Sequence, residues 1–183
     1  MADVKILALV GSLRAASINR QLAELAAETA PEGVAVTVFQ GLGDLPFYNE
    51  ELDGTDTPVA AQALRDQVAA ADRVLAVTPE YNGTMPAVLN NAIDWLSRPY
   101  GVGALQGKPF AVVGATPTQF GGRWSHEDAR RSATVAGAEV VPDLVLSHST
   151  LDADVFEEPE VFAEFLAALV TLVEHRPAGM VAA

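Results

Sequence analysis

Short apolar runs alternate along the chain with segments whose apolar residues recur at helical spacing. The run 4–10 is almost wholly apolar and ends at Gly11, which is typical of a strand buried on both faces of a parallel sheet. Further apolar runs predict strands at 34–39, 73–77, 108–114 and 140–146. Helical spacing predicts helices at 18–30, 58–71, 87–97, 124–136 and 161–173.

The alternation of strand and helix predicts an α/β fold, with a parallel sheet covered by helices on both faces. We expect one domain over residues 1–183, because this length suits a single core and no linker or repeat interrupts it. The segment 41–57 is rich in Gly, Pro, Asp and Asn and predicts a long loop. Ligands of such folds lie at the carboxyl ends of the strands, so the turns that follow the strands are the candidate sites.

Acidic residues outnumber basic ones, 24 Asp plus Glu against 11 Lys plus Arg, which gives a formal charge of −13. This charge opposes attraction to nucleic acid phosphates, so we expect no DNA or RNA partner. The chain has no cysteine, so thiolate nucleophiles and cysteine-ligated clusters are excluded and redox chemistry would need a borrowed cofactor. The apolar run 6–10 is too short for a signal-peptide core or a membrane span, so we expect a cytoplasmic protein without membrane contact.

The three histidines, His126, His148 and His175, have no metal-ligand spacing with one another or with carboxylates. We therefore expect no metal site, and histidines that are exposed to solvent or near helix ends. Ser12 and Ser17 have no identifiable His–Asp partners, so a hydrolase triad is not expected either.

Loop A, residues 11–20, carries the strongest chemical signal. Ser12, Arg14, Ser17 and Asn19 place four hydrogen-bond donors in eight residues, directly before the amino end of a helix. Helix amino ends attract anions, so this loop predicts a phosphate site. The alternative is that Ser17 merely caps the helix and Arg14 is a solvated charge. The loop lacks both G-x-x-x-x-G-K-[ST] and G-x-G-x-x-G, which favours a terminal phosphate monoester.

Loop B, residues 78–86, is the second unusual turn. Two prolines make it rigid, and the pair Asn82-Gly83 permits positive φ with exposed amides. Tyr81 supplies a flat apolar surface. Such a turn can present backbone hydrogen bonds to a heteroaromatic edge, although an ordinary strand-to-helix turn explains it equally well. Pro86 suits the first turn of the following helix, where its missing N–H costs nothing.

Two motifs together resemble the NAD(P)H-dependent FMN reductase family, and the resemblance extends over nearly the whole chain. They are G-S-L-R-x-x-S-x-N-R in loop A and P-E-Y-N-G-[ST]-x-P-x-x-L-x-N-A-I-D-W from loop B onward. The resemblance implies a flavodoxin-like three-layer sandwich with a five-stranded parallel sheet. It implies an enzyme that transfers a hydride from NADPH or NADH through FMN to a small acceptor, such as a quinone, flavin, azo compound or metal oxyanion. The chemistry would be borne by the flavin, with no catalytic side chain required. The resemblance also implies a homodimer or homotetramer.

The same resemblance assigns residues to the cofactor. Loop A would hold the FMN phosphate, loop B would line the isoalloxazine and ribityl portion, and loop C, residues 114–122, would lie beside the flavin pyrimidine. Loop C is the looser match, since Thr116 and Pro117 stand where serine and glycine are common. The residues assigned to FMN are Ser12, Arg14, Ser17, Ile18, Asn19, Pro79, Glu80, Tyr81, Asn82, Gly83 and Thr116.

Two further points bear on function. The segment 45–50 resembles the family stretch at the active-site mouth and dimer interface, although an aromatic anchor for the loop explains it equally well. Asn90, where the family commonly has lysine, leaves the fold unaffected but could alter subunit contacts. The rival function is a flavodoxin-like electron carrier with little NAD(P)H turnover. The acidic charge suits a carrier, whereas Arg14 favours the enzyme, because carrier phosphate loops are typically Thr- and Ser-rich.

Overall fold

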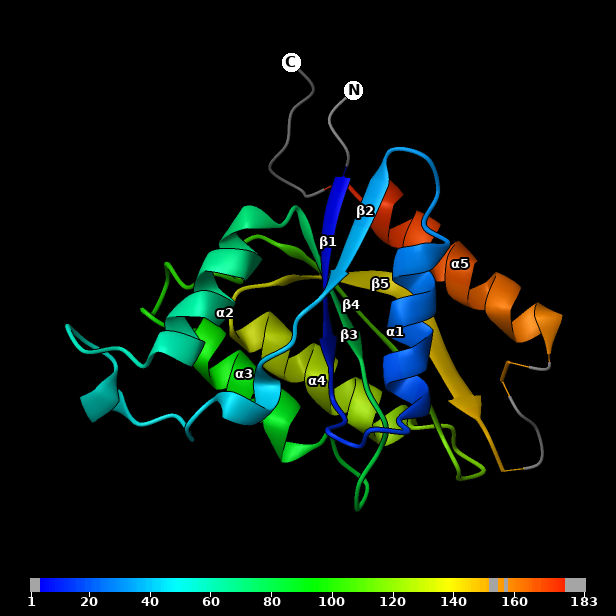
Figure 1. Cartoon of the computed structure of the whole chain (residues 1–183), viewed down its shortest axis with the longest axis horizontal. Helices are drawn as coiled ribbons and strands as arrows, with labels where there is room; N and C mark the ends of the chain where they lie inside the picture. Colours follow the sequence, from blue (N-terminus) through cyan, green and yellow to red (C-terminus); the bar gives the residue numbers. More distant parts are fainter. Residues whose placement is uncertain (1–3, 152–154, 157, 177–183) are drawn as a thin grey trace.

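A parallel sheet forms the centre of the protein in a computed structural model that describes residues 4–151, 155, 156 and 158–176 (Figure 1). Within that part of the chain, five strands pair in parallel in the order β2-β1-β3-β4-β5. The predicted α/β class and flavodoxin-like arrangement are thus confirmed. The strands are β1 (Val4–Val10), β2 (Val34–Val38), β3 (Arg73–Val77), β4 (Pro109–Thr116) and β5 (Glu139–Ser149).

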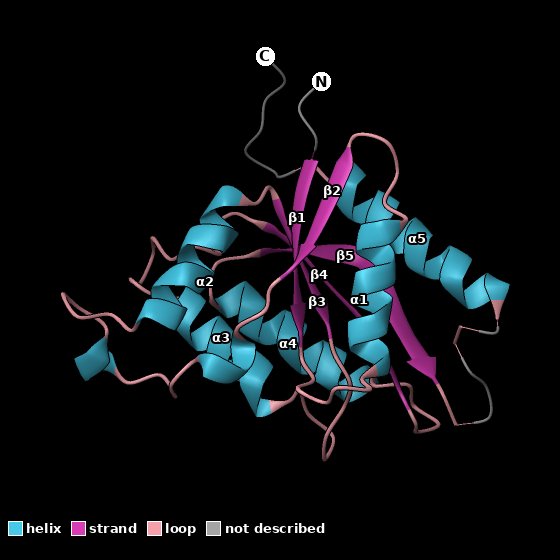
Figure 2. Ribbon diagram, in the orientation of Figure 1, coloured by secondary structure: helices cyan, strands magenta, loops and turns pink. Residues whose placement is uncertain are grey.

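Helices cover both faces of the sheet (Figure 2). Because side chains alternate along a strand, Leu7 and Leu9 of β1 pack into one core cluster with α2, α3 and α4, whereas Ile6, Ala8 and Val10 pack into another with α1 and α5. The near-continuous apolar strands therefore bury both faces. The helices are α1 (Ile18–Glu28), α2 (Val59–Ala70), α3 (Ala87–Leu96), α4 (Arg123–Val135) and α5 (Pro159–Glu174).

Strand ends differ most from the predicted bounds at the last two strands. β4 runs to Thr116 and β5 runs from Glu139 to Ser149, and the added residues of β5 pair with the end of β4 at Gly114–Ser147 and Thr116–Ser149. The extension of β5 is polar, so hydropathy gave no sign of it. Pro86 lies at the N-cap of α3, one position before the predicted first turn. The predicted frayed tail after Pro177 lies outside the described residues.

The connection 41–57 is a loop that contains two short 3-10 helices, Leu42–Asp44 and Glu50–Leu52. The carbonyl of Pro46 fixes it to α3 by accepting hydrogen bonds from Asn91 Nδ2 at 3.0 Å and Trp95 Nε1 at 2.8 Å. Tyr48 packs edge-on against Trp95, with ring centroids 5.0 Å apart. The segment 45–50 thus includes an aromatic anchor. No helix in the described ranges has the length and apolar character needed to cross a lipid bilayer.

Candidate functional site

The strand order reverses between β1 and β3, which are neighbours in the sheet. From β1 the chain moves outward to β2, and it returns to place β3 on the other side of β1. Loops A, B and C follow β1, β3 and β4, so all three lie at one edge of the sheet, across this switch point. In doubly wound folds this is where ligands bind.

Glycines let the three loops lie in direct contact. A methyl group built on Gly11 would lie 2.2 Å from Thr78 Oγ1, and one built on Gly114 would lie 2.2 Å from the Thr78 carbonyl oxygen. Both distances are far below van der Waals contact, so no side chain fits at either position. Thr78, which is fully buried, is the common neighbour through which β1, β3 and β4 meet.

Loop A leads into the amino end of α1 and supplies the residue that caps it. Ser17 is the N-cap, and its Oγ accepts a hydrogen bond from the amide of Arg20 at 3.2 Å. The amides of Ile18 and Asn19 begin the helix, where no earlier turn supplies a carbonyl. Arg14 is exposed, and Ser12 is buried with its Oγ 3.4 Å from the amide nitrogen of Arg14. Ser17 thus caps α1, as the alternative interpretation of loop A predicts. The first amides of the helix also face the candidate site.

Asn19 ties loop A to β4. Its Oδ1 accepts from the amide of Ala115 at 2.9 Å, and its Nδ2 donates to the carbonyl of the same residue at 2.8 Å. The carbonyl of Val113 accepts from Thr78 at the end of β3, and Ala115, two residues further, faces the same way. The Asn19 carboxamide therefore bonds the backbone of Ala115 as a neighbouring strand would, at a level of the sheet where β3 has already ended.

Loop B adopts the backbone that its sequence predicts. Asn82 has φ 53° and Gly83 has φ 73°, both in the left-handed region. Tyr81 and Thr84 exchange backbone hydrogen bonds of 3.1 and 3.2 Å, which closes a tight turn. The Tyr81 side chain is 44% exposed at the tip of this turn. The turn therefore offers an exposed ring at the switch-point edge.

Glu80 joins loop B to loop C and α4. Its Oε2 accepts from the amides of Trp124 at 2.9 Å and Ser125 at 3.2 Å, and its own amide donates to Thr116 Oγ1 at 2.8 Å. The N-cap of α4 is Gly122, which has no side chain. The carboxylate of Glu80 thus caps α4 from a distant loop, favourably placed against the helix dipole.

Two more hydrogen bonds fix loop B to α4. Ser125 Oγ donates to the carbonyl of Pro79 at 2.8 Å, and Thr84 Oγ1 donates to Asp128 Oδ2 at 2.6 Å. The bond from Thr84, together with the neighbouring Arg131, lowers the pKa of the Asp128 carboxyl below its ordinary value. Loop B is therefore held along its length by the first two turns of α4.

His126 is the deepest of these contacts. It lies in the first turn of α4, near a helix end as expected, but its side chain is 2% exposed. Nε2 lies 3.1 Å from the Thr78 carbonyl oxygen, so Nε2 carries a proton and donates it. Nδ1, 2.5 Å from Ser147 Oγ, then accepts from that hydroxyl. Burial lowers the pKa of His126 to about 4, so the ring is neutral at pH 7.

The low pKa of His126 predicts acid sensitivity. In the unfolded chain the imidazole has its ordinary pKa near 6.5, so as pH falls the unfolded state binds the proton first. This contribution to stability is complete above pH 6.5, and about 3 kcal/mol of it is lost as the pH falls to 4. Urea unfolding measured across that range checks it. The variant His126→Gln should lose this part of the slope; an identical slope in both proteins would contradict the assignment.

Loop C contributes an orphan hydroxyl. Thr118 Oγ1 is buried and has no hydrogen-bond partner among the described residues. Buried hydroxyls are ordinarily paired, so an unpaired one at the edge of a candidate site indicates a position where a ligand atom would complete the bonding. The sequence analysis includes Thr78 in loop B and Thr118 in loop C without a role for either, expects His126 to be exposed or near a helix end, and does not single out Ser125. Only their positions beside the assigned motifs could have singled them out.

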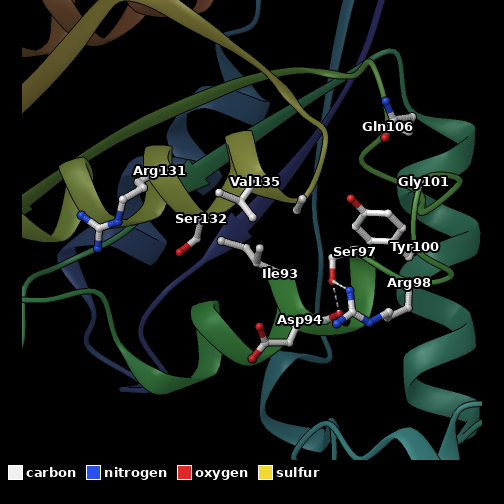
Figure 3. Close-up of a pocket in the computed structure, with 11 residues that line it drawn as sticks. Ile93, Asp94, Ser97, Arg98, Tyr100, Gly101, Gln106, Arg131, Ser132 and Val135 are labelled. Atoms are coloured by element: carbon white, nitrogen blue, oxygen red, sulfur yellow. Dashed lines mark hydrogen bonds between the residues drawn. The ribbon is translucent and has the colours of Figure 1, made fainter.

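A separate groove of about 720 Å³ lies away from these loops, between the carboxyl half of α3, the chain that follows it and α4 (Figure 3). None of the residues assigned to FMN lines it. Tyr100 projects into it, while Val135 lies on the α4 side. Its lining residues are Ile93, Asp94, Ser97, Arg98, Tyr100, Gly101, Gln106, Arg131, Ser132, Val135 and Ala136.

The strand order 2-1-3-4-5, with three loops and the amino end of α1 at its switch point, defines a flavodoxin-like protein. The sequence profile of the NADPH-dependent FMN reductase family matches residues 4–152. The chain belongs to this family.

Individual relatives agree with that membership. A quinone reductase of Pseudomonas putida is 44% identical over 124 residues, which cover 68% of this chain and 66% of the relative. A 2-hydroxy-1,4-benzoquinone reductase of Burkholderia is 46% identical over 118 residues, 64% of this chain and 63% of the relative. The chain thus spans just under two thirds of these relatives. The structure of FerB, a flavoenzyme NAD(P)H:(acceptor) oxidoreductase from Paracoccus denitrificans, superposes with a TM-score of 0.79 at 28% identity, covering 93% of this chain and 98% of FerB.

Proposed function

We propose that this protein is an FMN-dependent NAD(P)H oxidoreductase that reduces small acceptors, quinones foremost. The observation that carries the proposal is the convergence of loops A, B and C at the β1/β3 switch point, with the first turn of α1 beside them. The relatives named above as quinone reductases support it. When bound, FMN would supply the redox chemistry by taking a hydride from the nicotinamide and returning two electrons to the acceptor.

The residues present fit this cofactor. The amides of Ile18 and Asn19, the hydroxyls of Ser12 and Ser17 and the guanidinium of Arg14 would hold the phosphate. Loop B would line the rings, with Pro79, Tyr81, Asn82 and Gly83 contributing backbone and surface. Glu80 would contribute through its backbone, because its carboxylate already caps α4. A flavin carbonyl or ring N–H beside loop C would pair with the orphan hydroxyl of Thr118, next to Thr116.

The side chains of the site have positioning roles in this proposal rather than chemical ones. Asn19, Glu80 and His126 each bond a backbone group of another element, so their part is to hold loops A, B and C together. A cradle fixed before the ligand arrives loses less entropy on binding. We assign no acid or base to the protein.

The test separates the enzyme from the electron carrier. The purified protein is examined for yellow flavin, and NADH or NADPH is then added with a quinone. Rapid bleaching followed by catalytic turnover is the expected result. A yellow protein that neither nucleotide bleaches would show the carrier, and a colourless protein unaffected by added FMN would overturn both.

Arg14 gives the sharpest binding prediction. A charge-assisted hydrogen bond to phosphate contributes about 1.5–3 kcal/mol, so Arg14→Ala should weaken FMN binding by about ten- to a hundredfold. Titration of the flavin-free protein with FMN, followed by flavin fluorescence, measures it. Arg176→Ala is the matched control, because that exposed arginine follows the carboxyl end of α5, outside loops A, B and C, and its loss should leave the affinity unchanged. Equal affinities for Arg14→Ala and the parent would remove Arg14 from the site.

We further propose that the chain is a single flavin-binding domain that works in the cytoplasm as a homodimer or homotetramer. Several large apolar side chains support self-association by their exposure, among them Phe47 at 80% and Tyr100 at 87%. Analytical ultracentrifugation of the FMN-loaded protein tests the assembly. A monomer at micromolar concentration would overturn this part alone.

A further inference from the structure

Two exposed aromatic rings lie together where loop C meets α4. Phe120 is 46% exposed and Trp124 is 44% exposed. Their ring centroids are 4.7 Å apart and their planes are tilted by 50°. A single exposed apolar residue needs no explanation, but adjoining exposed aromatic rings form a surface suited to contact with a partner.

Hydrogen bonds place this pair at the edge of the candidate flavin site. The amide of Trp124 donates to the carboxylate of Glu80 at 2.9 Å, and the amide of Glu80 donates to Thr116 Oγ1 at 2.8 Å. Tyr81, the residue after Glu80, is exposed as well. The backbone that carries Trp124 is thus fixed beside residues that would line the flavin rings, and the Phe120 ring packs against the Trp124 ring.

The charge around the pair favours a neutral ligand. Arg123, the adjoining cation, is bridged to Glu127 with 2.9 Å between Nε and Oε1. The protein as a whole carries a formal charge of −13, which disfavours the approach of anions. A nicotinamide dinucleotide brings a charged pyrophosphate, whereas a quinone is flat, aromatic in size and uncharged. The surface therefore suits the acceptor better than the donor.

We propose that Phe120 and Trp124 form a stacking subsite for the electron acceptor, which selects neutral planar rings of the quinone class over non-planar acceptors. This inference rests on the proposed function. The overall reaction balances, because a quinone becomes a hydroquinone by gaining two electrons and two protons, supplied as one hydride from NAD(P)H and one proton from solvent. The two side chains contact the acceptor and set its affinity.

Tryptophan fluorescence gives a readout that does not depend on turnover. The chain has two tryptophans; Trp95 is fully buried, so Trp124 is the one that a surface ligand can reach. Titrating the FMN-loaded, oxidised protein with 1,4-naphthoquinone should quench Trp124 with saturation. Phe120→Leu should raise the half-saturating concentration by about three- to tenfold, which corresponds to the loss of one aromatic contact. An unchanged half-saturation, or quenching that does not saturate, would overturn the subsite.

Steady-state kinetics with matched acceptors completes the test. Trp124→Ala and Phe120→Leu should raise KM for 1,4-naphthoquinone by about three- to tenfold. Trp124→Phe, which keeps a ring, should restore it. KM for ferricyanide, which is octahedral, and the rate at which NADH bleaches the flavin should not change. Val135→Ala, at an exposed position further along α4, is the control. Slower bleaching by NADH with KM for the quinone unchanged would instead make the pair a donor site and overturn the inference.

The two proposals fail in different ways. A protein without flavin absorbance, or one that no nucleotide bleaches, overturns the proposed function before any quinone is added. Saturable quenching of Trp124 in that protein would show that the pair binds planar rings and would overturn its role as an acceptor subsite. A protein that is bleached and turns over, but whose quinone KM is the same in all variants, overturns the subsite alone.

Discussion

Replacing Asn19 with alanine is expected to lower the free energy of unfolding by about 2–5 kcal/mol, since both the amide and the carbonyl of buried Ala115 lose their partner. Small domains have total stabilities of about 5–15 kcal/mol, so this is a large fraction. Loop A would also lose its attachment to β4, and FMN binding should weaken with it. Urea unfolding of the flavin-free protein and an FMN titration measure the two effects.

The control for Asn19 is a side chain that makes a hydrogen bond on the surface. Gln62 bonds Asp66 one helical turn away in α2 and is exposed. Gln62→Ala should change the unfolding free energy by no more than about 0.5 kcal/mol. If Asn19→Ala were as mild as Gln62→Ala, the carboxamide would have no part in joining loop A to the sheet.

Gly114→Ala is expected to be equally severe for a steric reason. The new methyl group would lie 2.2 Å from the Thr78 carbonyl oxygen and 2.7 Å from Asn19 Oδ1, so β3 and β4 would have to move apart. Overpacking a close-packed interior costs about 1–3 kcal/mol, and contact with rigid backbone places this variant at the upper end. Thermal unfolding followed by circular dichroism, together with FMN retention during purification, tests it.

Gly54 supplies the comparison for Gly114. A methyl group built there meets nothing within 4 Å, and the change to alanine should be neutral within about 0.5 kcal/mol. If the two alanine variants unfolded at the same temperature, the close approach of loops B and C would not be a constraint on the site.

Most of the fold could be predicted because buried strands appear in the sequence as short apolar runs, and amphipathic helices as apolar residues at helical spacing. β1 and β3 have the predicted bounds, while the extension of β5 was missed because Ser147 and His148 are held by pairing with β4 rather than by hydropathy. The hydropathy pattern indicates which residues are buried, so it cannot predict a strand segment whose polar residues are held by backbone hydrogen bonds. The same limit hid the burial of His126, which stands in a segment of charged residues.

The candidate site was predictable in its backbone and not in its side-chain contacts. Loop B shows this well, since the pair Asn82-Gly83 foretold the left-handed turn. Nothing local could foretell that Glu80 bonds amides 44 and 45 residues further along, or that Asn19 bonds Ala115 across 96 residues. Such contacts depend on which strands become neighbours. The motifs therefore indicate which loops form the candidate site, whereas the strand topology determines which side chains meet there.

The cap that Glu80 places on α4 has a consequence for where an anionic group can bind. Helices α1, α3 and α4 follow loops A, B and C, so their amino ends lie at the same edge of the sheet, and a helix amino end can by itself attract a phosphate. The carboxylate of Glu80 bonds the first amides of α4, so the protein's own anion occupies that end. A second anion is therefore disfavoured beside loop C, whereas Ser17 at the start of α1 is an uncharged cap that adds no such repulsion.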